Sequence, residues 1–331
     1  MIFVQLAIGL LLLLGGGEAL VKGAVAIARR LGLSPLVIGL TLVGFGTSTP
    51  ELVASLQAAL RGSPGIALGN VVGSNIVNIV GILGLTAVIL PVATTRKAFQ
   101  RDGAALVGIT LLMCGLILFG TLPRSAGILL LVLLLAYTVG TYLGERNARQ
   151  APSAVRRTDC ATETEQALPP RGRLSLARGV LLAVGGIAAV VFGADLLVGA
   201  AIVLARTAGL SEAVIGLTLV AFGTSLPELV TSVTAAVRRH TDVAFGNVVG
   251  SNILNILGIA GATAVLSPIA VPPEIARFDV WVMTGAALLL VLFAVTGWRV
   301  NRWEGGVFLA AYGLYMAVQF SPGARVALGL S

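Results

Sequence analysis

Long apolar runs alternate with short polar loops along the whole chain. Each run is long enough to cross the hydrocarbon core of a bilayer as a helix. The runs fall at about 2–28, 34–60, 65–90, 104–121, 125–143, 176–204, 211–237, 243–267, 279–297 and 304–320. This pattern predicts an all-α integral membrane protein with about ten transmembrane helices, divided equally by the polar segment 145–174.

One of these runs contains polar residues that an ordinary transmembrane helix does not carry. Residues 44–51 read GFGTSTPE. Pro50 offers no N–H to the carbonyl four residues back, and its ring pushes that carbonyl away. Glu51 follows, and a carboxylate near the bilayer centre costs roughly 2.5–3.5 kcal/mol on insertion scales. Lipid cannot satisfy freed backbone groups, so such a break lines a cavity or is buried in protein. Together, these oxygens predict half of a site for a hard cation.

The same pattern returns later in the chain. Residues 221–228 read AFGTSLPE, which places Glu228 177 positions after Glu51. About two-thirds of the positions between 38 and 84 match their partners at this step without a gap. The step also relates Asn70, Ser74, Asn75 and Asn78 to Asn247, Ser251, Asn252 and Asn255. The chain is therefore predicted to be a duplication that keeps the polar parts of its spans in both copies.

Positive charges indicate how the two copies lie in the membrane. Of the 22 Lys and Arg residues, 16 lie in loops after odd-numbered spans, and 5 lie after even-numbered spans or in the C-terminal tail. Cytoplasmic loops carry the excess of Lys and Arg, so both termini are expected outside. Five spans per copy is an odd number, so the second copy enters the membrane inverted, and inverted repeats place a transport site at the midplane. We predict a first repeat at 1–144, a flexible cytoplasmic linker at 145–174 and an inverted repeat at 175–331, in the cell (inner) membrane.

Composition narrows the chemistry. Hydrophobic residues make up 57% of the chain, charged residues 11%, and the mean hydropathy is +0.99, which excludes a soluble protein. The net charge of +8 lies in loops, so it predicts topology and no nucleic-acid partner. One His and two Cys show no metal or redox spacing, which disfavours a zinc or copper site. Membrane lipid is expected around the protein, with no cofactor and no obligate protein partner.

Glu51 and Glu228 lie at similar offsets from the midpoints of their spans, but in opposite directions across the membrane. Inversion is therefore expected to bring the two carboxylates together, and a divalent cation between them would match their charge. Calcium accepts six to eight oxygens at about 2.3–2.6 Å in flexible geometry, whereas magnesium keeps its water, so a dry site favours Ca²⁺ or Na⁺. The alternative for either residue alone is a buried, hydrogen-bonded acid.

A second motif reads GNVVGSNIVNIVG at 69–81 and GNVVGSNILNILG at 246–258. Ser74 and Asn78 are four residues apart, as are Ser251 and Asn255, so each pair shares a helix face. Their neutral oxygens suit a cation shell, but Ser and Asn also join membrane helices by hydrogen bonds. We expect packing or backbone capping for Asn70, Asn75, Asn247 and Asn252. Outside the motifs we expect a structural ion pair between Glu18 and Lys22, with its counterpart Asp195 unpaired.

These motifs carry a resemblance to a known family. GTSTPELVAS with GNVVGSNIVNI, repeated as GTSLPELVTS with GNVVGSNILNI, resembles the α-repeats of the Na⁺/Ca²⁺ exchanger family, prokaryotic type, within the cation/Ca²⁺ antiporter superfamily. The resemblance covers both repeats and implies ten transmembrane helices with alternating access around four cation sites. It implies that the ligands are the carboxylates of Glu51 and Glu228, the backbone carbonyls of Thr47 and Thr224, and oxygens of Ser48, Ser225, Ser74, Ser251, Asn78 and Asn255. Some relatives hold an aspartate where this chain has Asn255, and H⁺-coupled and K⁺-assisted relatives share the fold, so coupling ion and stoichiometry stay open.

The sequence thus predicts a secondary antiporter, not an enzyme, that exchanges Ca²⁺ for Na⁺. Exchange of Ca²⁺ (or another cation) for protons is the alternative, because the two glutamates could carry protons themselves. An intramembrane hydrolase could use two carboxylates as acid and base, but it needs them in unequal environments, and the duplication makes their surroundings alike. A passive channel is also possible, although broken helices at a closed midplane site suit a carrier better.

Overall fold

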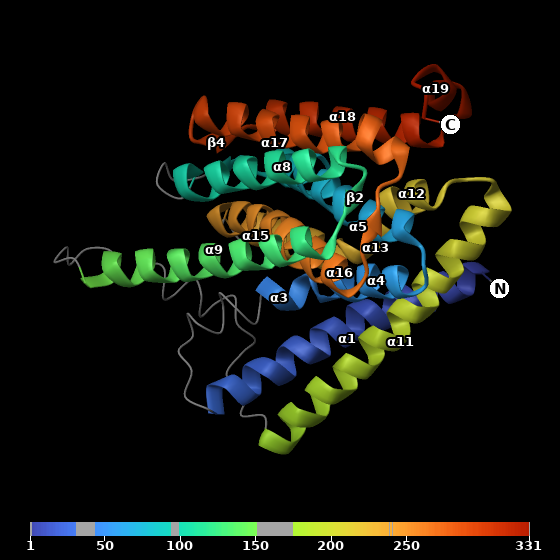
Figure 1. Cartoon of the computed structure of the whole chain (residues 1–331). Helices are drawn as coiled ribbons and strands as arrows, with labels where there is room; N and C mark the ends of the chain where they lie inside the picture. The colour runs from blue at the N-terminus through green and yellow to red at the C-terminus, as the bar shows by residue number, and fades with distance from the viewer. Residues whose placement is uncertain are drawn as a thin grey trace.

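The computed structural model describes residues 2–30, 44–93, 99–150, 175–237, 239 and 241–330, and these are mostly helical (Figure 1). The first half contains α1 (Ile2–Arg30), α3 (Gly44–Thr47), α4 (Thr49–Leu60), α5 (Pro64–Ile76), η2 (Val77–Leu83), α6 (Gly84–Ile89), η3 (Phe99–Gly103), α8 (Ala104–Leu118) and α9 (Arg124–Gln150). The second half contains α11 (Leu176–Ala208), α12 (Glu212–Ile215), η4 (Gly216–Val220), α13 (Ala221–Thr224), α14 (Leu226–Val237), α15 (Thr241–Leu254), η5 (Asn255–Ala260), α16 (Gly261–Leu266), η6 (Ile275–Asp279), α17 (Val280–Val295), α18 (Arg302–Phe320) and α19 (Pro322–Ala327).

The helices have the length and apolarity of a membrane protein. Within the described ranges, six helices are long and apolar enough to cross a membrane, and one bent pair of helices would make a seventh span. Large apolar side chains such as Leu11, Leu181 and Leu314 are about 70% exposed, at 69%, 72% and 69%, as expected where lipid replaces water. Residues 31–43, which include the first part (34–43) of the predicted second span, lie outside the described residues.

The predicted linker is shorter than the polar composition indicated. Helix α9 continues to Gln150, so residues 145–150 are helical and not part of a flexible segment. Residues 151–174 lie outside the described part of the chain, and their expected mobility and cytoplasmic location stay predictions.

Both predicted helix breaks are present. Helix α3 ends at Thr47 and α4 begins at Thr49, and in the second half α13 and α14 are separated at Ser225 by a bend of 47°. The break lies at the serine, two residues before the proline, because Pro50 occupies the first turn of the new helix. Proline fits there without loss, since N–H groups of the first turn have no intrahelical acceptor.

Wider helical turns adjoin the second motif. Residues of η2 and η5 form π-helical turns, and these segments hold Asn78 and Asn255. Such turns are rare and are found frequently at functional sites. Apolar periodicity over a few residues does not distinguish them from α-helix, so the sequence did not predict them.

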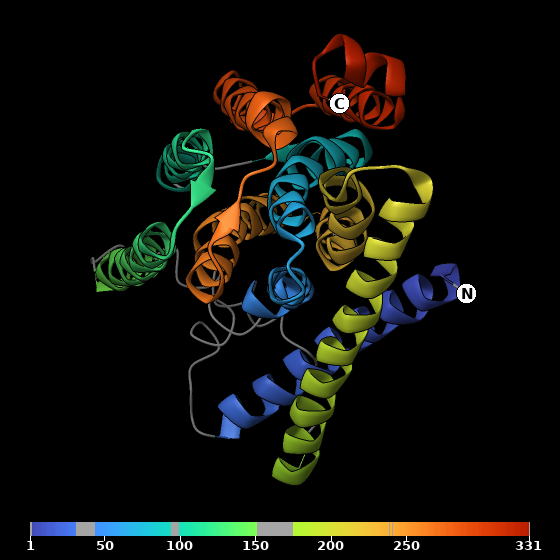
Figure 2. The same ribbon diagram turned by 45° about the vertical axis from the view of Figure 1, so that its right-hand side comes forward.

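Helices α1 and α11 cross at close range, as the blue and yellow-green helices show in both views (Figure 2). The crossing is possible because glycines face each other. A Cβ added to Gly186 would lie 2.5 Å from the backbone nitrogen of Leu20 and 2.7 Å from the carbonyl of Gly16, whereas one added to Gly185 would meet nothing within 4 Å. Small residues of this kind let membrane helices pack backbone to backbone.

Two short strand pairs tie loops of the first half to loops of the second. Strand β1 (Val92–Ala93) pairs antiparallel with β4 (Arg299–Val300), and β2 (Thr121–Leu122) pairs antiparallel with β3 (Ile269–Ala270). Both pairs therefore cross between the two copies of the duplication.

Candidate cation site

The two glutamates are buried and are linked through serines of the opposite repeat. Glu51 is 1% exposed and Glu228 is 0% exposed. The hydroxyl of Ser225 donates to Oε1 of Glu51 at 3.0 Å, and the hydroxyl of Ser48 donates to Oε1 of Glu228 at 3.0 Å. Each carboxylate thus accepts a hydrogen bond from the serine at the helix break of the other repeat. These two contacts bring both carboxylates into one cluster.

Local structure favours negative charge at both positions. Glu51 lies in the first turn of α4, and Glu228 lies in the first turn of α14. The N-terminal turn of a helix carries a partial positive charge, which stabilises a carboxylate there. The break at each serine therefore exposes a helix N-terminus at the same place where the chain puts an acid.

The second oxygen of each carboxylate is buried but accepts no hydrogen bond from the described residues. Among the described residues, Oε2 of Glu51 and Oε2 of Glu228 are buried and have no hydrogen-bond partner. A buried polar atom without a partner is costly, and in a native structure it calls for an explanation such as an ion. Both free oxygens belong to the cluster in which a cation was predicted.

Two asparagines hold the acidic helices to the second motif. The Nδ2 of Asn70 donates to the carbonyl of Glu51 at 3.0 Å and to Ser55 at 2.9 Å. The Nδ2 of Asn247 repeats the arrangement with the carbonyl of Glu228 at 3.3 Å and with Ser232 at 3.0 Å. This is the backbone-binding role expected for both asparagines. The sequence interpretation missed the two serines, although they are also related by the step of 177.

The predicted polar ligands of the second motif are buried on segments that pack against the acidic helices, α5 and η5 against α4, and α15 and η2 against α14, and several have free atoms. Ser251 donates to Oε1 of Glu228 at 3.4 Å. Within the described residues, the Ser74 hydroxyl, Oδ1 of Asn78 and both amide atoms of Asn255 are buried without a partner. Neutral oxygens that lack partners, on segments packed against the acidic helices, suit a hard cation, which accepts carboxylate, hydroxyl and amide oxygens together.

The two threonines end the helices before the breaks. Thr47 and Thr224 are the last residues of α3 and α13, and the last carbonyls of a helix lack intrahelical partners. The Thr47 hydroxyl interacts with the Glu228 carboxylate. The Thr224 hydroxyl lies 3.1 Å from Oδ1 of Asn70 and 3.0 Å from the carbonyl of Val220. Of the predicted ligands, those that contact one of the two carboxylates are Ser48, Ser225, Ser251 and Thr47. Thr224 is linked to the Glu51 backbone through Asn70, and the ligand role of all these residues stays a prediction.

The donor set also limits the kind of ion. Within the described residues, no three His, Cys, Asp or Glu side chains form a group that could hold a metal ion. The negative charge at the cluster therefore comes from two carboxylates, which match one divalent cation, and the other donors are neutral oxygens. Hard cations such as Ca²⁺ and Na⁺ fit this set, whereas zinc prefers nitrogen and sulfur ligands.

Two acidic residues outside the cluster are held by ion pairs. Lys22 binds Glu18 at 2.5 Å, as predicted from their spacing. The prediction that Asp195 has no partner is wrong, because it forms an ion pair with Arg61. Arg61 caps the C-terminal end of α4 and lies 134 residues from Asp195 in the sequence. The spacing of residues within one helix could therefore not reveal this ion pair.

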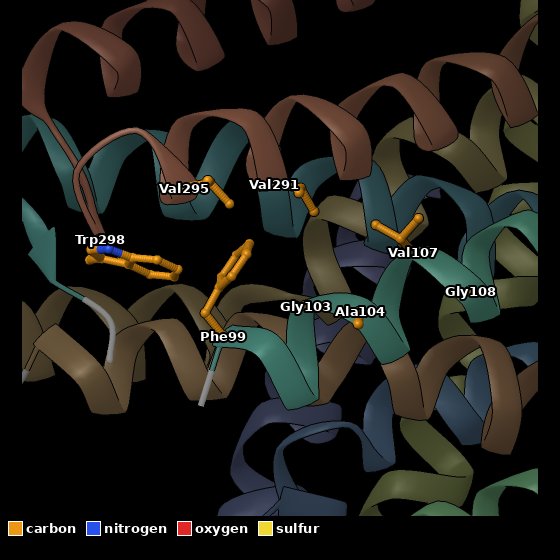
Figure 3. A pocket seen from close by; sticks show the side chains of 8 residues that line it. All are labelled: Phe99, Gly103, Ala104, Val107, Gly108, Val291, Val295 and Trp298. Carbon is orange, nitrogen blue, oxygen red and sulfur yellow. The ribbon is translucent and has the colours of Figure 1, made fainter. Parts of the chain in front are cut away.

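An apolar cavity of about 660 Å³ lies at another place, between the start of α8 and the end of α17 (Figure 3). Its lining comprises Phe99, Gly103, Ala104, Val107, Gly108, Val291, Val295 and Trp298. These side chains offer no oxygen donors suited to a cation. The cavity is therefore not the cation site.

Several known proteins are similar to this chain over nearly its whole length. A family model described as "sodium/calcium exchanger protein" matches residues 1–143 and 178–321. The chain is 36% identical to the putative antiporter CaxA of Alkalimonas amylolytica over 95% of this chain and 97% of that one. It is 35% identical to the sodium/calcium exchanger MaX1 of Methanosarcina acetivorans over 96% and 98% of the two chains. A solved structure of the sodium-calcium exchanger NCX_Mj, soaked with Na⁺ and Sr²⁺, matches with a TM-score of 0.63 and 32% identity over 96% of this chain and 99% of that one.

Proposed function

The chain belongs to the sodium/calcium exchanger protein family and is a membrane-spanning cation/Ca²⁺ antiporter, and on that premise we propose that it exchanges Ca²⁺ for Na⁺. The observation that carries the proposal is the crossed arrangement of Ser225 with Glu51 and Ser48 with Glu228, each at 3.0 Å. It leaves one oxygen of each carboxylate buried and unpaired among the described residues. These two oxygens, with the free hydroxyl and amide oxygens around them, would hold the ion.

The ligands we propose are those predicted from the sequence. Glu51 and Glu228 supply the charge, and Ser74, Ser251, Asn78 and Asn255 supply neutral oxygens from the second motif. Ser48, Ser225, Thr47 and Thr224 contribute from the two breaks. Ca²⁺ would be held by both carboxylates, whereas Na⁺, with half the charge, would share them with a further Na⁺. Competition for the same carboxylates couples the two ions, because only one kind can neutralise the cluster at a time.

Ten transmembrane helices in two inverted repeats are part of this proposal. The strand pairs support it, because β1 and β4 lie in loops predicted after spans three and nine, whereas β2 and β3 lie in loops after spans four and eight. Each pair thus joins two loops that the distribution of Lys and Arg places on the same side of the membrane. A parallel duplication would put the two members of a pair on opposite sides, where strands cannot hydrogen-bond.

Proton exchange is the second candidate. It is favoured by the asparagines at positions 78 and 255, which leave Glu51 and Glu228 as the titratable groups of the cluster and thus as the groups that would carry protons. An intramembrane hydrolase is disfavoured because each carboxylate accepts from the serine at the opposite break and lies in the first turn of a helix, whereas an acid and a base need clearly unequal surroundings.

Flux measurements in proteoliposomes separate the candidates. Uptake of radioactive Ca²⁺ would be measured first under a Na⁺ gradient at equal pH, and then under a pH gradient without Na⁺. We expect uptake that follows the Na⁺ gradient and collapses when an ionophore removes it. Uptake under the pH gradient alone would show that the exchange is coupled to H⁺ and not to Na⁺. The absence of uptake under both gradients would contradict Ca²⁺ exchange.

A further inference from the structure

Four asparagines at the cation cluster break the symmetry of the duplication. Asn75 and Asn252 are related by the step of 177, as are Asn78 and Asn255. All four are buried, at 0% or 1% exposed. The crossed serine–glutamate contacts are formed in both directions, whereas among the described residues the asparagine contacts are formed in one direction only.

In the contacts that are formed, Asn252 of α15 reaches across to the first repeat. Its Oδ1 accepts from Nδ2 of Asn78 at 3.0 Å, and its Nδ2 donates to the carbonyl of Asn75 at 3.4 Å. The amide of Asn78 is thereby oriented, because its NH₂ group is engaged and its oxygen remains free and buried among the described residues. The contact presents the oxygen of Asn78, and not its NH₂ group, to the cluster.

The equivalent contacts on the other side are absent from the described residues. Asn75 donates instead to the carbonyl of Val71 in its own helix at 2.8 Å. Its Oδ1 has no partner there, and Nδ2 of Asn255, which the duplication would place against it, has none either. One donor and one acceptor that match each other are therefore both buried and both unused.

The serines repeat this asymmetry. Ser251 contacts Glu228 at 3.4 Å, whereas the hydroxyl of its counterpart Ser74 has no partner within the described part of the chain. The free atoms of Ser74, Asn75 and Asn255 are those that would be engaged if the two repeats exchanged their conformations.

We propose that Asn252 and Asn75 are positioning residues that form two alternative latches, one for each direction of access; this rests on the proposed exchange function. The structure holds the latch made by Asn252. In the opposite state Asn75 leaves Val71, accepts from Asn255 and donates to the carbonyl of Asn252. Asn252 then turns back to the carbonyl of Val248, four residues earlier in its own helix.

This exchange follows from the inverted arrangement. In transporters built from inverted repeats, alternating access moves one repeat against the other around a fixed site. Because the two copies are equivalent, exchanging their conformations would give the state open to the other side. Each latch orients one amide ligand, Asn78 in one state and Asn255 in the other. Switching the latch therefore changes which repeat presents an oriented amide oxygen to the ion.

The test compares variants in sealed, oriented vesicles. Apparent Ca²⁺ affinity would be measured from each side for the wild type, Asn252→Leu, Asn75→Leu and the double variant. Leucine keeps the volume and removes the hydrogen bonds, so each single variant should weaken one state. We expect the ratio of the two affinities to shift about fivefold in opposite directions for the two single variants, and to return toward the wild-type ratio in the double variant.

Thr110→Val is the matched control, because Thr110 is a buried polar residue of α8 outside the cluster and the ratio should not change. Shifts of the ratio in the same direction for both single variants, or no shift in either, would overturn the latches in favour of ordinary packing contacts. A leucine variant that does not fold is replaced by Asn→Ser at the same position, with the same expected directions. Wild-type vesicles without any Ca²⁺ flux would contradict the proposed function itself, which is a distinct result.

Discussion

Neutralising one carboxylate gives the most direct test of the cation cluster. In Glu51→Gln and Glu228→Gln, the amide oxygen can still accept the serine hydroxyl that now donates to Oε1 at 3.0 Å. The side-chain volume is almost unchanged, and one buried charge is removed. We therefore expect folded protein in the membrane and a loss of Ca²⁺ transport.

The size of the effect follows from the charges. At an effective dielectric constant of about 20, two unit charges 4 Å apart interact by about 4 kcal/mol. A divalent ion thus loses about 8 kcal/mol of attraction when one carboxylate becomes neutral. The repulsion between the two carboxylates is present both before and after the ion binds, so it does not enter the difference in binding free energy. A loss of about 8 kcal/mol corresponds to a decrease of about a millionfold in affinity, which abolishes Ca²⁺ binding at usable concentrations.

The assay is Ca²⁺ binding by calorimetry on purified protein, with flux in proteoliposomes as the second measurement. Glu304→Gln is the matched control, because Glu304 caps α18 away from the cluster and glutamine also serves in a capping box. The control should bind and transport Ca²⁺ like the wild type. Near-normal binding or flux in either cluster variant would refute the assignment of these carboxylates as ligands.

Three further outcomes are expected. Deleting part of 151–174, while keeping enough residues to join α9 to α11, should preserve flux, and loss of flux in a well-expressed deletion would show that the segment does more than connect. Asp195→Asn should retain transport and change stability by about 0–1 kcal/mol, because its ion pair with Arg61 is partly exposed; abolished transport would place Asp195 in the ion path. Gly186→Ala should lower the free energy of unfolding in detergent by about 1–3 kcal/mol, measured as a lower thermal unfolding temperature, because its Cβ would clash with α1. In Gly185→Ala the added Cβ meets nothing within 4 Å, so its unfolding temperature should not fall. Equal unfolding temperatures for the two alanine variants would contradict the close crossing of α1 and α11.

The local sequence pattern was sufficient to predict much of the fold and part of the candidate site. Apolar runs predicted the transmembrane character, and the step of 177 revealed the duplication and paired Glu51 with Glu228. The broken helices were also predictable, because proline and a carboxylate within an apolar run leave few other solutions. Helix propensity could not place the break itself, which lies at Ser48 and Ser225 because the proline occupies the first turn of the next helix.

Contacts between distant parts of the chain were decided by the tertiary structure alone. Ser225 donates to Glu51 and Ser48 donates to Glu228 across 174 and 180 residues of sequence, respectively, and Asp195 pairs with Arg61 of another helix. The one-sided asparagine contacts are also invisible in a sequence whose two motifs are nearly identical. Periodicity along a chain reports which face of a helix is apolar, and a repeat reports which positions are equivalent. Which equivalent atoms touch depends on how two inverted halves dock, and in a structure that favours one side over the other, equal sequences have unequal partners.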